Sequence, residues 1–217
     1  KSYEFFNKPA RWVANRIEVN CAVSEEAAAT AREALGGSYE ILFNGIELDR
    51  YEIKEPPQTS KTIFFLGRHE PRKGLEVLIR AMKFLSDEVR LWIASDGPDT
   101  KRLQKATEDD RRIEWLGRIS EEEKISRLQK ASVFCAPSLG GESFGIVLLE
   151  AMASKTLVVA SDIPGYSKLT RGGLDALLFK KGDSTALSKA LDVALHDPNA
   201  SRPIVESALI RVRQFSM

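Results

Sequence analysis

The feature that most constrains the fold is a series of short strand-like runs after residue 61, most of them apolar throughout. They lie at 62–66, 89–94, 113–116, 133–136, 157–160 and 177–179, with helical patterns or loops between them. Strands that are apolar at every position are buried on both faces, which is typical of a parallel sheet covered by helices. The sequence therefore predicts an α/β fold: a Rossmann-like parallel sheet with helices on both faces.

The first 60 residues have a different pattern. Residues 1–16 indicate two short amphipathic pieces interrupted by Pro9, 17–23 a strand, and Ser24 the cap of a helix that ends at Leu35. A short strand is expected at 40–43. The polar stretch 45–60 contains Pro56-Pro57 and is the best domain boundary. We expect one part at 1–44, a linker at 45–60 and the α/β domain at 61–217.

The composition excludes few classes of function. The 217 residues hold 32 Lys plus Arg and 31 Asp plus Glu, so the net charge argues neither for nor against nucleic acid or membrane. No run of 18 uncharged apolar residues and no signal-peptide pattern is present. Cys21 and Cys135 lie in apolar, strand-like contexts without metal spacing. We expect both to be buried in a reducing compartment, with a disulfide as the minor alternative.

The stretch from Gly140 to Glu150 is the strongest candidate for a binding site. Glycines precede an apolar run that reads as a buried helix, and the start of such a helix favours phosphate. Glu142 and Glu150 bracket this anion site with groups that accept hydrogen bonds from hydroxyls. A sugar nucleotide has that layout. The alternative is a glycine-rich connection ahead of a core helix, with two solvated glutamates.

A second candidate follows the first strand of the α/β domain. Between Gly67 and Gly74 the sequence places Arg68, Arg72 and Lys73. Ligands of parallel sheets bind at the carboxyl ends of the strands, so these cations and the helix start are expected to meet a diphosphate together. The alternative is a basic turn that only keeps the edge soluble.

Other motifs are weaker. The run from Asp96 to Asp99 favours a simple turn before a helix, and His69 and His196 are expected to be surface or structural residues. No Asp-x-Asp pair and no His/Cys cluster occurs in the sequence. We therefore predict no metal site, and fixed cations instead to meet the charge of a departing diphosphate.

Taken together, these motifs resemble the nucleotide-sugar domain of retaining family 4 glycosyltransferases, which have the two-domain GT-B fold. The run 136–153 most resembles the phosphatidylinositol α-mannosyltransferases of actinobacteria. The resemblance covers residues from about 15 to about 200. It implies one half of a GT-B fold, with residues 1–44 as a remnant of the N-terminal acceptor domain. It also implies that most of that domain, and the terminal helix that crosses back to it, are absent.

The resemblance assigns roles by position. Arg68 and Lys73 would hold the donor diphosphate with Arg72 beside them, and Glu142 would contact the transferred sugar; Arg68, Lys73 and Glu142 are the candidate catalytic residues. Glu150 would bind the ribose hydroxyls. The other implied donor contacts are Ser143, Phe144, Gly145 and Ile146 at sugar and phosphate, and Ile119, Ser120, Glu121 and Lys124 at the base.

The implied activity is transfer of a hexose, mannose from GDP-mannose, to a lipid or glycan hydroxyl with retention. No cofactor or metal is required for donor binding, and no nucleic acid is a partner. We expect a cytoplasmic protein at the inner face of the membrane, with peripheral membrane contact in the complete enzyme. The isolated chain should be inactive. The alternatives are a non-catalytic sugar-nucleotide-binding module and a GT-B sugar-nucleotide epimerase.

Two positions depart from the family pattern. Ala94-Ser95 precedes Asp96 where many relatives have a glycine, which is expected to crowd the approach to the ligand. Ser154-Lys155 occupies a helix end where a glycine is usual. A side chain other than glycine in a left-handed cap costs about 1 kcal/mol.

Overall fold

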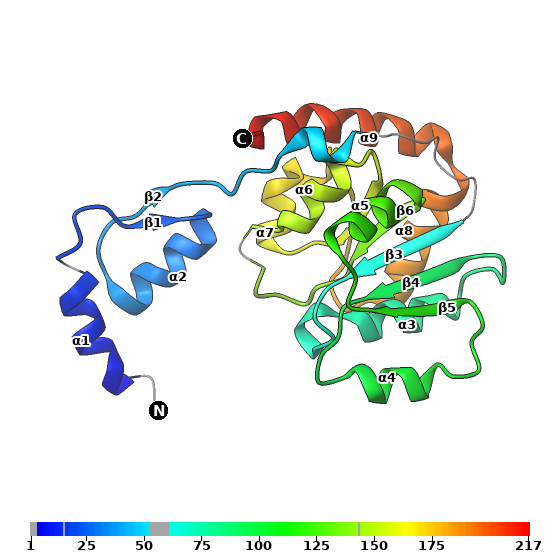
Figure 1. Cartoon of the computed structure of the whole chain (residues 1–217), viewed down its shortest axis with the longest axis horizontal. Helices are drawn as coiled ribbons and strands as arrows, with labels where there is room; N and C mark the ends of the chain where they lie inside the picture. The colour runs from blue at the N-terminus through cyan, green and yellow to red at the C-terminus, as the bar shows by residue number, and fades with distance from the viewer. Residues whose placement is uncertain (1–3, 15, 53–60, 143) are drawn as a thin grey trace. The chain divides into compact units, whose positions relative to one another are not determined.

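The computed structural model describes residues 4–14, 16–52, 61–142 and 144–217. Contacts between residues divide the chain into two units, Lys1–Gly45 and Ile46–Met217, which are described separately (Figure 1). The predicted linker at 45–60 begins with ordered structure that belongs to the second unit: the 3-10 helix η1 spans Leu48–Tyr51, and Tyr51 is buried. Its continuation at 53–60 lies outside the described residues.

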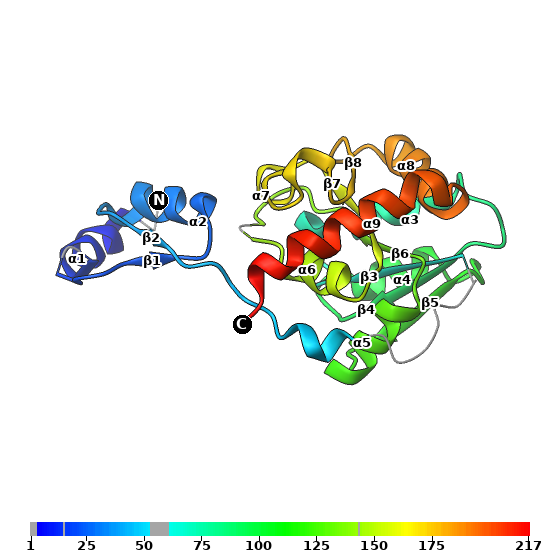
Figure 2. The ribbon, with the colours of Figure 1, turned by 90° about the horizontal axis from the view of Figure 1, so that it is seen from above.

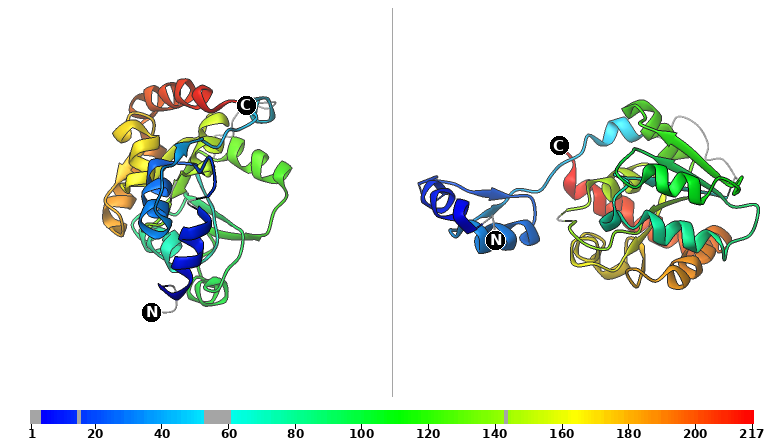
Figure 3. Two further views of the ribbon diagram at one scale, coloured as in Figure 1. Left: turned by 90° about the vertical axis from the view of Figure 1, so that its left-hand side faces the viewer. Right: turned by 90° about the horizontal axis from the view of Figure 1, so that it is seen from below.

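The first unit contains two helices and two very short strands. Helix α1 is Glu4–Ala14, β1 is Cys21–Ala22, α2 is Glu25–Leu35 and β2 is Glu40–Ile41; the two strands pair in parallel. Ser24 caps α2 by accepting from the backbone N–H of Ala27, as predicted. Arg11 joins α1 to α2 through the carbonyls of Glu33 and Ala34, and the two blue helices lie together in Figure 3.

Three expectations for this unit are wrong. One helix runs through Pro9 where two pieces were predicted, since a helix can continue past a proline at the loss of one backbone hydrogen bond. The expected strand at 17–23 shrinks to Cys21–Ala22, because only these residues find a partner strand. Cys21 is exposed while Cys135 is buried, because apolar neighbours in sequence do not fix which face of a short strand is covered.

The second unit is a six-stranded, all-parallel sheet in the order β5-β4-β3-β6-β7-β8. Its strands are β3 (Thr62–Leu66), β4 (Arg90–Ala94), β5 (Ile113–Gly117), β6 (Val133–Ala136), β7 (Leu157–Ser161) and β8 (Leu177–Phe179). Counted from β3, this is the 3-2-1-4-5-6 order of dinucleotide-binding folds. The strand order reverses between β3 and β6.

Helices cover both faces of the sheet, which confirms the predicted fold class. They are α3 (Leu75–Met82), α4 (Thr100–Ala106), α5 (Glu121–Lys130), α6 (Ile146–Ala153), α7 (Pro164–Leu169), α8 (Ser184–His196) and α9 (Pro198–Val212), with the 3-10 helices η2 (Pro71–Lys73), η3 (Arg171–Gly173) and η4 (Arg213–Phe215). Helix α3 packs on α8, and α6 packs on α5 and α9; α9 runs alongside α6 in Figure 2.

The alternation of side chains along each strand explains why the strands are apolar throughout. Ile63 and Phe65 join the core beneath α3 and α8 together with Val133. The intervening Phe64 and Phe134 are equally buried and meet edge to face at 6.0 Å. Because successive side chains of a strand point to opposite faces, both faces of the sheet are buried.

Helix α9 was not predicted, although the sequence carries its start signal. The Asp197 carboxylate accepts from the backbone N–H groups of Asn199 and Ala200, and Pro198 occupies the first helical position. Within the described parts of the chain, no helix is both long and apolar enough to cross a membrane.

The end of α6 confirms the strained cap expected at Lys155. Lys155 has φ 57°, while its N–H donates to the carbonyl of Met152 and that of Thr156 donates to Ala151. This pair of bonds defines a Schellman motif, whose left-handed position favours glycine. The sequence therefore places a lysine where the backbone favours glycine.

We expect Lys155→Gly to raise the free energy of unfolding by about 1 kcal/mol, because glycine adopts a left-handed φ without steric cost. Chemical denaturation of both proteins measures the change. Arg171→Gly is the matched control, since Arg171 also has a positive φ of 50° but binds the buried Asp175 through two hydrogen bonds. That variant should be destabilised. A higher free energy of unfolding in both variants, or in neither, would contradict this explanation.

Candidate functional site

Two loops flank the point where the strand order reverses, at the carboxyl ends of β3 and β6. The β3 loop is Gly67–Gly74, and we call the segment Pro137–Glu142, which follows β6, the β6 loop. They meet at Gly74, where an added Cβ would lie 1.9 Å from the carbonyl oxygen of Pro137. The N–H of Leu139 also donates to the carbonyl of Arg72 at 2.7 Å. The loops therefore form one edge, at the place where open α/β sheets bind ligands.

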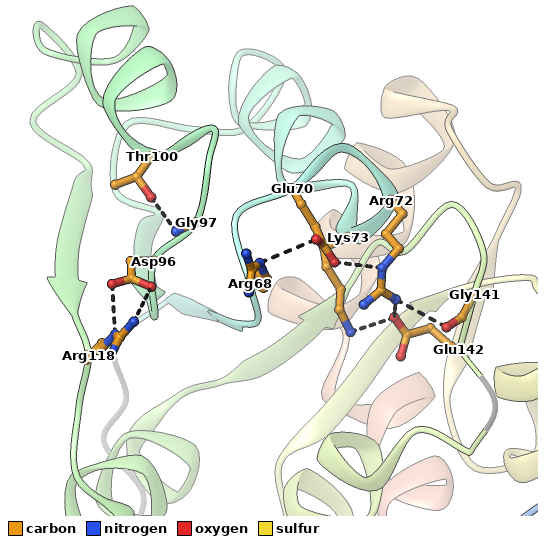
Figure 4. Close-up of polar contacts among 10 residues, drawn as sticks. All are labelled: Arg68, Glu70, Arg72, Lys73, Asp96, Gly97, Thr100, Arg118, Gly141 and Glu142. Carbon is orange, nitrogen blue, oxygen red and sulfur yellow. Dashed lines mark hydrogen bonds and ion pairs between the residues drawn. The ribbon is translucent and has the colours of Figure 1, made fainter. Parts of the chain in front are cut away.

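The structure brings the predicted catalytic residues Lys73 and Glu142 into contact (Figure 4). Lys73 Nζ donates to Glu142 Oε1 at 2.6 Å, and a guanidinium nitrogen of Arg72 donates to the same oxygen at 3.2 Å. The side chain of Glu142 is only 11% exposed. One carboxylate oxygen thus lies between two cations from the other loop. This cluster confirms that the β3 loop gathers positive charge beside the β6 loop.

Arg68, the third predicted cation, is less constrained. Its side chain is 68% exposed, and its Nε lies 3.5 Å from Glu70 Oε2. The other oxygen of Glu70 lies 2.6 Å from Arg72 Nε. Glu70 therefore links two arginines of the β3 loop (Figure 4). This role of Glu70 was not predicted, although the residue stands inside the motif.

Two residues behind Glu142 were also missed as site residues. Ser138 Oγ donates to Glu142 Oε1 at 3.3 Å and lies 3.0 Å from the hydroxyl of Tyr166. Tyr166 is almost fully buried, and this burial, followed by the charge of Glu142, raises the pKa of its hydroxyl. Tyr166 also contacts the position of Gly145, where an added Cβ would lie 3.0 Å from its ring. The hydroxyls of Tyr166 and Ser138 therefore form a hydrogen-bonded chain that ends at Glu142 Oε1.

Glu150 is buried in the second turn of α6 and forms a separate cluster. Its Oε1 accepts from Lys124 Nζ at 2.6 Å and from the hydroxyl of Tyr51 at 3.1 Å. Lys124 also lies 2.8 Å from Glu121. Burial lowers the pKa of Lys124, but its hydrogen bonds to Glu121 and Glu150 outweigh burial and raise it. Lys124 therefore stays charged and orders two carboxylates.

The other residues that were predicted to contact the base lie around the start of α5. Ser120 caps the helix by accepting from the N–H of Glu123. Ile119 lines a pocket of about 400 Å³ together with Leu66, Arg68, Ser95, Asp96 and Arg118. Ser95 has φ 86°, so the serine that departs from the family pattern adopts a backbone conformation that favours glycine, and it borders this pocket.

The start of α6 was predicted to present backbone groups to sugar and phosphate. Gly145 caps the helix in the left-handed conformation with φ 82°, and Ile146 begins it with a half-exposed side chain. Phe144 is buried against Phe215, with ring centroids 5.6 Å apart. Ser143 lies outside the described residues.

The Asp96–Asp99 turn leads into α4, as predicted, and contacts His69. The N–H of His69 donates to the carbonyl of Asp96 and its own carbonyl accepts from Asp99. Its ring is buried, lies 2.8 Å from the hydroxyl of Thr100 through Nδ1, and has a lowered pKa because of burial. An exposed bidentate pair joins Arg118 to Asp96 (Figure 4).

No group of three or more metal-ligating His, Cys, Asp or Glu side chains exists among the residues that the structure describes. The groups that could hold an anionic ligand are instead the cations of the β3 loop. Acceptors for ligand hydroxyls are Glu142 in the β6 loop and Glu150 in α6. This arrangement suits a ligand that carries hydroxyls near a phosphate.

Comparisons with known sequences agree with this geometry. A family model described as "Glycosyl transferases group 1" matches residues 49–210. The phosphatidyl-myo-inositol mannosyltransferase of Mycobacterium leprae is 37% identical over 202 residues, covering 89% of this chain and 54% of that protein. The D-inositol 3-phosphate glycosyltransferase of Corynebacterium glutamicum is 31% identical, covering 78% and 43%. The chain spans about half the length of these curated relatives.

Solved structures support the fold. The Anabaena protein HepE, crystallised with UDP and glucose, matches with a TM-score of 0.87 at 22% identity, covering 96% of this chain and 62% of that one. Sucrose-phosphate synthase from Thermosynechococcus elongatus matches with a TM-score of 0.80 at 23% identity, covering 94% and 56%.

Proposed function

The chain belongs to the group 1 glycosyl transferases and has the fold of one half of a GT-B enzyme; on that basis, we propose that residues 46–217 bind the nucleotide-sugar donor of a retaining mannosyltransferase, with GDP-mannose as donor. The observation that carries the proposal is the cluster of Arg72, Lys73 and Glu142 where the strand order reverses. The relatives named phosphatidyl-myo-inositol mannosyltransferase support mannose as the hexose.

In this proposal Arg68 and Lys73 bind the donor diphosphate and Arg72 assists them. Negative charge grows on the diphosphate as its bond to the sugar breaks, and the cations held at this edge stabilise that charge. Glu142 contacts the sugar. The oxygen of an acceptor hydroxyl bonds to the sugar carbon with retention of configuration as the bond to the diphosphate breaks, and the hydroxyl proton passes to the departing diphosphate. Positioning and electrostatics then supply the catalysis, so these residues are the catalytic candidates.

The remaining groups hold the nucleoside. Glu150 accepts from the ribose hydroxyls, and the base lies near Ile119, Ser120, Glu121 and Lys124, beside the pocket of about 400 Å³. The start of α6 offers Gly145 and Ile146 backbone groups to the phosphate. Charged hydrogen bonds contribute about 1.5–3 kcal/mol each, so two or three of them with base contacts reach the ~8 kcal/mol of micromolar binding.

Donor binding in this proposal needs no metal, because three cations of the β3 loop take its place. The acceptor, a lipid or glycan hydroxyl, would be bound mainly outside residues 46–217. A lipid acceptor would bring the complete enzyme to the inner face of the cell membrane, as a peripheral protein.

A calorimetric titration of the chain with GDP, UDP and ADP tests the proposal. We expect GDP to bind with a dissociation constant of about 1–10 μM, the affinity estimated from the contacts above, and more tightly than UDP or ADP. EDTA and excess Mg²⁺ should leave the GDP constant unchanged. Preference for another base would overturn the GDP assignment, and a requirement for Mg²⁺ would overturn the role of the cations. The absence of binding to all three nucleotides would overturn the proposal as a whole.

A further inference from the structure

The geometry around Glu150 points to Tyr51 as a positioning residue, one that sets the orientation of the carboxylate that receives the ribose. The inference rests on the proposed function, since it assumes that Glu150 contacts the donor. It adds a residue from outside the sheet and from the segment that was predicted as a linker. Tyr51 lies 99 residues before Glu150 in the chain.

The Tyr51 hydroxyl and Lys124 Nζ both donate to Oε1 of Glu150, at 3.1 Å and 2.6 Å. Among the described residues, no hydrogen bond to Oε2 is found. Two donors on one oxygen fix the plane of the carboxylate and leave its other oxygen to accept from a ligand hydroxyl. Since Tyr51 is 5% exposed and Glu150 is 9% exposed, water competes little for either group.

The backbone that carries Tyr51 is itself held in place. The side-chain amide of Gln129, on α5, donates to the carbonyls of Tyr51 and Glu52 at 3.3 Å and 3.1 Å. Before η1, Ile46 pairs with Ser216 next to the C-terminus. A positioning residue requires such support, because a loosely held hydroxyl would not define the carboxylate.

The chemistry of the hydroxyl suits a permanent donor. Burial, followed by the charge of Glu150, raises the pKa of Tyr51. The phenol therefore keeps its proton near neutral pH and stays a hydrogen-bond donor. Lys124 neutralises the carboxylate as well as helping to orient it, whereas Tyr51 contributes to its orientation without adding charge.

The test compares GDP with 2′,3′-dideoxy-GDP, which lacks both ribose hydroxyls, by calorimetry. The wild-type chain should prefer GDP by about tenfold or more, as expected for hydrogen bonds to a charged group. Tyr51→Phe should lose about fivefold in affinity for GDP and should bind the dideoxy nucleotide as the wild type does. A residue that only stabilises the fold would change both affinities alike.

Tyr166→Phe is the matched control, because it removes the hydroxyl of another buried tyrosine, one that reaches Glu142 through Ser138. Its GDP-to-dideoxy preference should equal that of the wild type, and thermal melts of both variants check that they fold. Equal losses of both ligands in Tyr51→Phe, an unchanged preference, or the same loss of preference in Tyr166→Phe would overturn the positioning role. If the wild type binds neither nucleotide, the proposed function fails first.

Discussion

Gly74→Ala should destabilise the second unit by about 2–5 kcal/mol, the largest effect that we expect of a single methyl group here. An added Cβ would lie 1.9 Å from the carbonyl oxygen and 2.8 Å from the carbonyl carbon of Pro137. Both atoms belong to the backbone, so the two loops would have to separate, at a cost of about 1–3 kcal/mol. The left-handed φ of 69° adds about 1–2 kcal/mol for any other residue. Chemical denaturation of the chain measures the sum.

Gly117→Ala separates these two contributions. Gly117 has nearly the same φ, 66°, but nothing lies within 4 Å of the position of its Cβ. This variant should lose only the conformational contribution, about 1–2 kcal/mol. If both variants lose the same amount, then the close approach of the β3 loop to the β6 loop has no energetic weight. In that case the two loops would not form one continuous edge.

Lys73→Ala should weaken binding of GDP at least about tenfold. A hydrogen bond between charged groups contributes about 1.5–3 kcal/mol, and about 1.4 kcal/mol corresponds to a factor of ten. Lys73 is the least exposed of the three cations of the β3 loop, at 21% against 50% for Arg72 and 68% for Arg68. Since water screens it least, its loss should cost more than that of Arg68.

Lys83→Ala provides the control for this measurement. Lys83 follows the last residue of α3, the helix whose first residue comes two positions after Lys73, and its side chain is exposed. Removing it changes the net charge by the same amount without touching the site. Calorimetric affinities should therefore match the wild type for Lys83→Ala and fall for Lys73→Ala. An unchanged affinity in Lys73→Ala would argue against the diphosphate assignment.

Most of the second unit could be predicted from its sequence, because a strand that is buried on both faces is apolar at nearly every position. Phe64 and Phe65 point to opposite faces and are both buried, so a continuous apolar run identifies a central parallel strand. The strands of the first unit are too short to show such a pattern. They contain two residues each, and a pair that short follows from tertiary contacts rather than from pattern.

The site was predictable only where its residues share a motif. Lys73 and Glu142 were each identified within a loop, and their contact follows from the order of the strands. No sequence motif links Tyr51 to Glu150, or Ser138 and Tyr166 to Glu142. Lys124 was expected near the base; its ion pairs with Glu121 and Glu150, and the 10% exposure of its side chain, were not predicted. Such pairings depend on side-chain directions, which a single sequence does not encode locally.

The contact between Lys73 and Glu142 has a consequence for any anion that enters this site. The protein already supplies a negative partner for its own lysine, so a phosphate group replaces one ion pair by another and does not neutralise an unpaired cation. The measured affinity is then a difference between two ion pairs. The displaced carboxylate, still in the β6 loop, becomes available as an acceptor for whatever hydroxyl accompanies the phosphate.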